Sequence, residues 1–100
     1  MIDIIHVMKT SAPSLLPILR SDLQGEVMAL LFSHPEQQYT VSQIADATRA
    51  SLPTVSREVN RLEQSGLVAV QNVGRTRMVQ AKVDNPVGQA MRQLILVTYG

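Results

Sequence analysis

The 100-residue sequence predicts a mainly helical domain with a small β-hairpin, an α+β fold. Two observations lead to this prediction. Between Ser21 and Gln64, apolar residues recur at helical spacing in segments that open on capping residues. After Gly66 the pattern changes to two short strand-like runs on either side of another glycine. One hundred residues are enough to bury a core, so we expect a single domain over residues 1–100.

The composition excludes several kinds of site. There is no cysteine, which rules out disulfides and thiolate metal sites, and His6 and His34 lie far apart with no second ligand at suitable spacing. We therefore expect no metal and no other cofactor. No apolar run approaches the roughly 18 residues of a membrane helix, and the N-terminus lacks the basic lead of a secretory signal. These features favour a cytoplasmic protein that does not enter a membrane.

The first helix is expected to follow an N-terminal extension. Residues 1–20 have no clean period and contain two prolines. Ser21 and Gln24 stand in the relation of a capping box, so a helix should begin after Ser21. It should stop before Pro35, because the residue before a proline is pushed out of the helical region.

Two further helices are expected in quick succession. After a short extended piece at residues 38–40, Thr40 and Gln43 form a second capping box that opens a helix over Val41–Thr48. Arg49 and Ala50 break it. Ser51 can then cap a helix over residues 51–65, with Pro53 in its first turn and Gly66 at its end. Its apolar positions are Leu52, Val55, Val59 and Leu62.

The remainder predicts a hairpin and a last helix. Residues 67–71 and 77–83 are expected as strands, joined by a loop at 72–76 that contains Gly74. Asp84 or Asn85 should cap a final helix, so that residues 84–100 follow a core of residues 21–83. Helices followed by a hairpin make the winged helix-turn-helix arrangement.

The segment "TVSQIADATRASLPTVSREVNRLEQSGLVAVQNVGRTRMVQAKV" resembles the DNA-binding domain of small bacterial repressors of the ArsR and MarR kind. The motif P-T-V-S-R-x-V-x-R-L-E-x-x-G-L-V is similar to their recognition helix and the start of their wing, and the match covers about residues 21–83. The resemblance implies a DNA-binding scaffold. The sequence departs from it at Arg49 and Ala50, where such proteins often place glycine, and the lack of cysteine removes the thiolate metal sensing of some ArsR relatives.

Charge is segregated along the chain. Residues 49–82 hold six cations and two acids, a local charge of +4, whereas the remainder holds three cations and six acids, a charge of −3. A basic segment of this kind is either a solvated face or the electrostatic footprint of a nucleic-acid partner. Its position on the predicted helix-turn-helix favours double-stranded DNA as the partner.

The helix over residues 51–65 supplies the candidate DNA contacts. At about 100° per residue its polar side chains face away from Val55, Val59 and Leu62. Arg57 is the candidate for a guanine edge and Asn60 for an adenine. Thr54 and Ser56 are short enough to hold phosphates, and Arg61 is expected on the backbone. The predicted DNA-binding residues of this helix are Ser51, Pro53, Thr54, Ser56, Arg57, Asn60, Arg61 and Gln64.

The predicted wing over residues 71–78 supplies a second set of contacts. Gly74 permits a sharp reversal, and Arg75 beside it is placed to enter the neighbouring minor groove. Arg77 is expected closer to phosphate, as is Lys82. The alternative is a hairpin whose charges only protect its edge from pairing with another strand.

The last helix has more apolar positions than one buried stripe needs, from Val87 to Val97. We expect a homodimer through the N- and C-terminal segments, since two-fold pairing is the commonest oligomer plan. The alternative is a single buried helix in a monomer.

The sequence as a whole predicts a sequence-specific DNA-binding transcriptional regulator. It has no acid pair, nucleophile–base set or phosphate-binding glycine loop, so we do not expect an enzyme. Two alternatives remain open. The first is a winged helix that contacts another protein and not DNA. The second is a winged-helix module of a larger protein, because the segment also resembles domains that precede nucleotidyltransferase-like domains.

Overall fold

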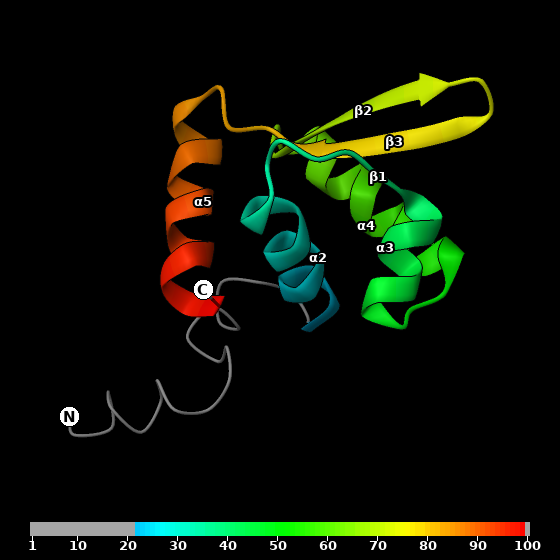
Figure 1. Ribbon diagram of the computed structural model, residues 1–100, viewed down its shortest axis with the longest axis horizontal. Coiled ribbons are helices and arrows are strands. Elements are labelled where there is room, and N and C mark those ends of the chain that lie inside the picture. Colours follow the sequence, from blue (N-terminus) through cyan, green and yellow to red (C-terminus); the bar gives the residue numbers. More distant parts are fainter. Residues whose placement is uncertain (1–21, 100) are drawn as a thin grey trace.

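The computed structural model describes residues 22–99. Figure 1 shows a group of helices beside a hairpin that projects to one side. The elements, in order, are α2 (Asp22–Ser33), β1 (Tyr39–Thr40), α3 (Val41–Thr48), α4 (Leu52–Gln64), β2 (Val68–Val73), β3 (Thr76–Ala81) and α5 (Pro86–Tyr99). This is the winged helix-turn-helix that the sequence predicts. The expected N-terminal extension over residues 1–20 and the cap at Ser21 lie outside the described residues.

The three strands form one antiparallel sheet in the order β1-β3-β2. Short strand β1 lies on β3, with Thr40 opposite Met78, and this pairing brings the start of α3 beside the half of the hairpin nearer its turn. Val73 pairs with Thr76, so only Gly74 and Arg75 form the turn. The five-residue loop predicted at 72–76 is therefore wrong, because the strands continue pairing to within two residues of each other.

Side-chain caps fix where the helices begin. The Thr40 hydroxyl accepts from the Gln43 amide at 3.0 Å, and the Gln43 side chain accepts from the Thr40 amide at 2.9 Å, which confirms the predicted capping box. The Ser51 hydroxyl accepts from the Thr54 amide at 3.4 Å. Asn85, and not Asp84, caps α5, since its side-chain oxygen accepts from the Gly88 amide at 2.7 Å. Each cap satisfies a backbone donor that lacks an intrahelical partner.

The tight turn between α3 and α4 contains a left-handed residue. Arg49 has φ 56°, the only positive φ of a non-glycine residue in the described part of the chain. The Ala50 amide then bonds the Ala45 carbonyl at 3.0 Å, which closes the end of α3. A left-handed side-chain residue costs about 1 kcal/mol, and the turn retains it without glycine.

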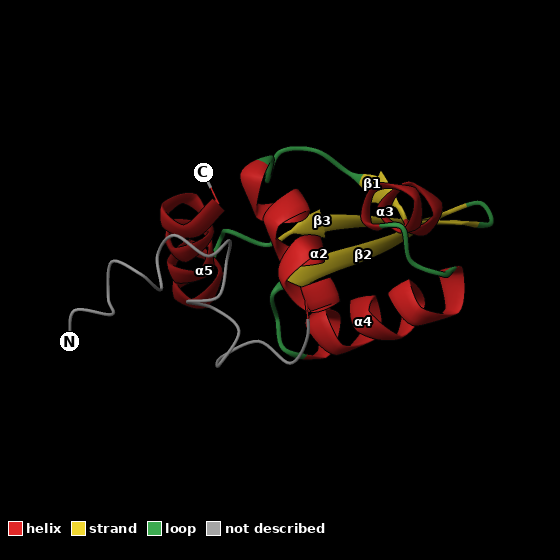
Figure 2. Cartoon of the chain, turned by 90° about the horizontal axis from the view of Figure 1, so that it is seen from below, coloured by secondary structure: helices red, strands yellow, loops and turns green. Residues whose placement is uncertain are grey.

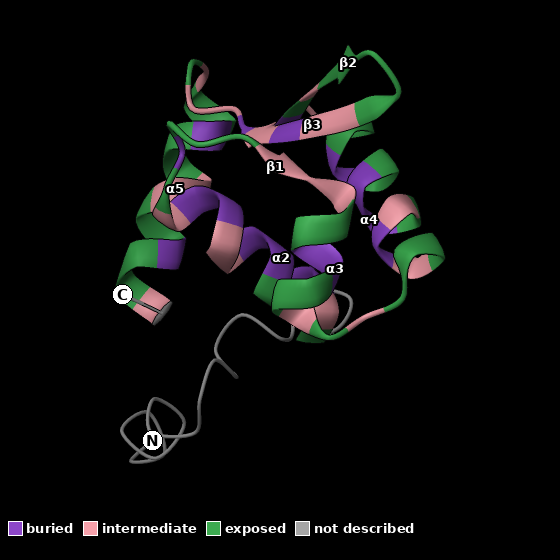
Figure 3. Ribbon diagram, turned by 45° about the vertical axis from the view of Figure 1, so that its right-hand side comes forward, coloured by how far each residue is buried: buried purple, intermediate pink, exposed green. Residues whose placement is uncertain are grey.

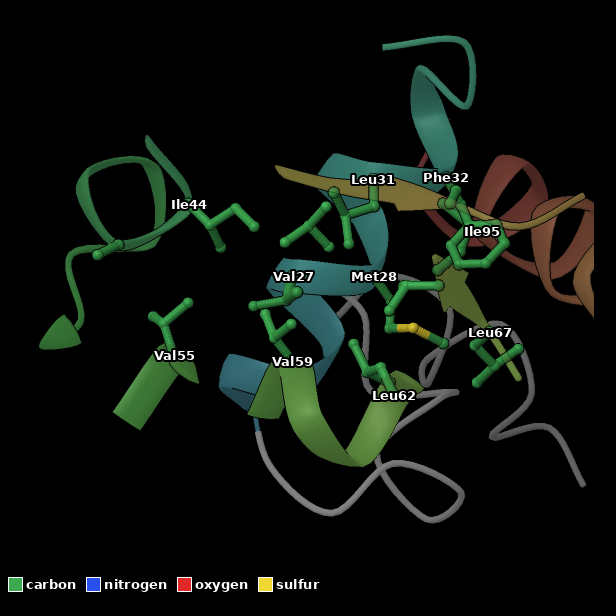
Figure 4. Packing of buried hydrophobic residues seen from close by; sticks show 14 residues of the cluster. Val27, Met28, Leu31, Phe32, Ile44, Val55, Val59, Leu62, Leu67 and Ile95 are labelled. Carbon is green, nitrogen blue, oxygen red and sulfur yellow. The ribbon is translucent and has the colours of Figure 1, made fainter. Parts of the chain in front are cut away.

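The core lies where α2, α3 and α4 meet. Figure 4 shows Val59 and Leu62 of α4 beside Val27 and Met28 of α2, with Ile44 of α3 in the same cluster. All are almost fully buried, and burying such a side chain contributes about 1.5–3 kcal/mol.

The predicted inner face of Val55, Val59 and Leu62 is confirmed, but two other residues of α4 depart from the apolar pattern. Leu52, the first residue of α4, is 51% exposed although it is apolar. Glu58, an acid among the aliphatic residues, is only 4% exposed. Gln24 of α2 donates to the Glu58 carboxylate at 2.7 Å, and Arg61 donates to it at 3.5 Å. A buried carboxylate is tolerated because it has such partners.

Helix α5 stands beside α2, at the end of the domain opposite the hairpin tip (Figures 1 and 2). Ile95 is fully buried against the core. Gly88 is also buried, and a Cβ added there would lie 1.7 Å from the carbonyl oxygen of Lys82. Only glycine therefore fits where the first turn of α5 lies against the backbone of Lys82. No helix among residues 22–99 is long and apolar enough to cross a membrane.

Candidate nucleic-acid interface

Helix α4 exposes a continuous polar face. Figure 3 shows its inner side buried and its outer side exposed. Arg57 is exposed and forms no hydrogen bond or ion pair with another described residue, so its five N–H groups are available to a partner. Arg61 is also exposed, but its guanidinium pairs with Glu58. Pro53, Asn60 and Gln64 lie on the exposed part of the helix as well.

The start of α4 carries a pair of hydroxyl groups. Ser51 and Thr54 lie 2.8 Å apart through their side-chain oxygens. Ser51 is exposed and Thr54 half-buried. They stand at the positive end of the α4 helix dipole and form a polar patch there, which favours an anion such as phosphate.

The wing reaches α4 through one side chain. Arg77 on β3 donates to the Ser56 hydroxyl at 3.2 Å and to the side-chain oxygen of Asn60 at 2.9 Å. Ser56 and Asn60 are one helical turn apart and so lie on the same flank of α4. The structure thus joins three predicted contact residues that the sequence treats as independent.

A groove separates the wing from the two helix-turn-helix elements. Its lining residues come from the starts of α3 and α4 and from the hairpin: Thr40, Val41, Ser42, Leu52, Pro53, Ser56, Arg75, Thr76 and Arg77. Thr40 and Ser42 line this groove although the sequence does not predict them as site residues. The capping box at Thr40 marks a helix start in the sequence, but only the pairing of β1 with β3 brings that start to the wing.

Arg75 lies at the tip of the hairpin. Gly74 has φ 64° at the first turn position, a conformation that glycine adopts without strain and that suits a two-residue hairpin turn. Arg75 follows it, exposed and without a partner among the described residues. The two predicted wing arginines therefore differ in their contacts. Arg75 has no partner among the described residues, whereas Arg77 is hydrogen-bonded to Ser56 and Asn60 of α4.

Among the described residues no group of three or more histidine or acidic side chains is arranged to hold a metal ion. The cations dominate the groove and the exposed face of α4, where Arg57, Arg61, Arg75 and Arg77 stand with no acid lining the groove. Such a surface attracts a polyanion.

Known structures share this fold. MepR of Staphylococcus aureus, a transcription regulator of the multidrug efflux pump MepA, superposes with a TM-score of 0.71 at 22% identity, over 94% of this chain and 69% of that one. A MepR–DNA complex gives 0.72 at 23% identity, over 96% and 78% of the two chains. HlyU from Vibrio cholerae gives 0.67 at 18% identity, over 85% and 87%. These likenesses concern the fold.

A search of curated protein sequences finds no significant match. A sequence profile does assign the chain: the profile of the MarR family matches residues 21–77. That stretch contains the described α2, β1, α3, α4 and β2, and ends in the wing at Arg77. It covers more than half of the sequence and includes both helices of the helix-turn-helix. The chain therefore belongs to the MarR family of transcription regulators.

Proposed function

We propose that the protein regulates transcription by binding a specific DNA sequence, with α4 in the major groove and the wing on the adjacent minor groove or backbone. The observation that carries this proposal is the free guanidinium of Arg57 on the exposed face of α4, beside a groove lined by two helix starts and two wing arginines. A recognition helix presents its N-terminal half to base edges, and Arg57 stands in that half.

The proposed contacts divide by chemistry. Arg57 reads a guanine edge through two N–H groups, and Asn60 reads the base beside it. Arg61 and Gln64 lie further along the helix, towards the DNA backbone. Ser51, Pro53, Thr54 and Ser56 line the start of α4 and position it between phosphates. In the wing, Arg75 reaches the minor groove or its phosphates, and Arg77 supports the helix.

The MepR–DNA complex shows that this fold docks on DNA in a protein of similar topology. We propose the same use here, in the cytoplasm and through binding, not catalysis. The unit that contacts DNA is residues 21–83, and residues 84–100 serve assembly.

Selection of bound sites from random double-stranded DNA tests the proposal most directly. The expected result is an enriched sequence with two related half-sites, because a two-fold dimer presents two copies of α4 about one helical turn of DNA apart. Binding without any enriched sequence, or no binding at low salt, would contradict it.

A homodimer is the second part of the proposal. Val87, Ala90, Leu94 and Val97 follow one another at i, i+3, i+7 and i+10 along α5, and all four are exposed. This spacing places them in one stripe, on a different side of the helix from buried Ile95. An apolar stripe of this kind supports pairing of α5 across a two-fold axis, together with residues of the N-terminal segment.

A further inference from the structure

Asn60 makes a contact that changes what it can recognise. Its side-chain oxygen accepts from an Arg77 N–H at 2.9 Å, while another N–H of the same guanidinium bonds Ser56 at 3.2 Å. Arg77 belongs to the wing, 17 residues further along the chain than Asn60. The contact therefore depends on how the wing packs on α4.

The chemistry of arginine fixes the orientation of the Asn60 amide. A guanidinium has five N–H donors and no acceptor, so only the amide oxygen can face it. The amide nitrogen then points away from Arg77. Asn60 is exposed, and no described residue accepts a hydrogen bond from this nitrogen. The group that points outward is thus a pair of N–H donors, and the oxygen is turned towards a cation that occupies one of its two lone pairs.

Adenine and guanine differ in what they require of such a group. Asparagine pairs with adenine by accepting from N6–H and donating to N7, which uses both ends of the amide. Guanine presents two acceptors, O6 and N7, in the same groove. An amide held with its donors outward matches the acceptors of guanine, whereas the amino group of adenine would have to approach an oxygen that faces the Arg77 guanidinium.

We propose that Arg77 acts as a specificity-determining residue: it holds Asn60 in the donor orientation, so that this position of the operator is guanine and not adenine. The inference rests on the proposed function, because it needs α4 in the major groove. It replaces the sequence-based assignment of Asn60 to adenine and of Arg77 to phosphate.

Arg77→Met removes every donor while keeping a long flexible side chain, and it frees the Asn60 amide to turn. We expect the selected operator of this variant to change at one base pair, where a preference for guanine of about tenfold is lost or becomes a preference for adenine. All other positions should keep their bases. Arg77→Lys is the conservative variant: an ammonium also has donors and no acceptor, so it still faces the amide oxygen, and more of the preference for guanine should be kept than in Arg77→Met.

Two controls separate the possible outcomes. Asn60→Ala should abolish the preference at the same base pair, and adding Arg77→Met to it should change nothing further there. Arg75→Ala should lower affinity for all sequences and leave this base pair unaltered. If Arg77→Met instead lowers affinity uniformly and retains guanine, Arg77 is a phosphate contact and the inference is wrong.

Failure of the proposed function has a different signature, namely a wild-type chain that enriches no DNA sequence. A measurement without DNA tests the orienting contact itself. NMR relaxation of the Asn60 side-chain amide should show restricted motion in the wild type and fast motion in Arg77→Met. An amide that is equally mobile in both proteins would overturn the orienting role.

Discussion

Arg57 illustrates how much depends on one side chain without a partner in its own chain. Its neighbour Arg61 is tied to Glu58 at 3.5 Å, whereas Arg57 is free and exposed. A free arginine can meet O6 and N7 of guanine with two N–H groups, at little cost in broken contacts.

Replacing Arg57 with alanine should therefore weaken binding to the selected operator by about 1–3 kcal/mol and relax the preference at one base pair. Fluorescence anisotropy titrations with operator and scrambled DNA measure both effects. Arg61→Ala is the matched control and should weaken binding to both DNAs alike. An Arg57→Ala protein that still discriminates as the wild type does would mean that another face of α4 reads the bases.

A second prediction concerns Gly88 and the stability of the fold. Alanine is normally the better helix residue by about 1 kcal/mol, but here its Cβ would lie 1.7 Å from the Lys82 carbonyl oxygen. Gly88→Ala should therefore lower the free energy of unfolding, by about 1–3 kcal/mol as for other overpacked sites. Chemical denaturation measures it. Gln93→Ala, on the exposed side of α5, should stay within about 0.5 kcal/mol of wild type. A Gly88→Ala protein as stable as wild type would show that α5 moves aside freely.

Among the elements, the wing projects from the domain and has one unpaired cation, Arg75, at its tip. Arg75→Ala should weaken DNA binding and reduce the slope of log affinity against log salt by about one unit, as expected for one lost phosphate contact. Titrations across a range of salt concentrations measure the slope. If Arg75 lies in the minor groove, the preference for flanking A·T pairs should also fall. An unchanged slope would remove the tip from the interface.

The elements also show what the sequence can and cannot predict. The caps at Thr40 and Ser51 were predictable because a cap joins residues three positions apart. The burial of Glu58 was not, since its partner Gln24 is 34 residues away on another helix. The Arg77 contacts likewise depend on how β3 packs against α4. Contacts across the fold leave no periodic signal in the sequence.

At the scale of the whole molecule, the exposed stripe on α5 determines how copies are expected to assemble. Leu94 and Leu96 are both 40% exposed, yet only Leu94 belongs to the stripe that runs from Val87 to Val97. The two leucines thus provide a matched pair on one helix.

Leu94→Glu should convert the proposed homodimer to monomer, or to insoluble protein, because a carboxylate in a dry interface has no partner. Operator affinity should fall with it, since one half-site contributes too little alone. Leu96→Glu should leave the dimer intact. Sedimentation equilibrium on the three proteins measures the mass. A wild-type chain that sediments as a soluble 11.0 kDa monomer would exclude the dimer.

The buried hydrogen bond between Gln24 and Glu58 also ties α2 to α4. The bond is 2.7 Å long and lies in the interior, so α2 cannot turn about its axis without stranding a buried carboxylate or carrying α4 along. Helix α5 packs on the other side of α2. A displacement of α5 should therefore pass through α2 to α4, so we expect contacts at the end of the molecule farthest from the wing tip to change the distance between the two recognition helices of the proposed dimer.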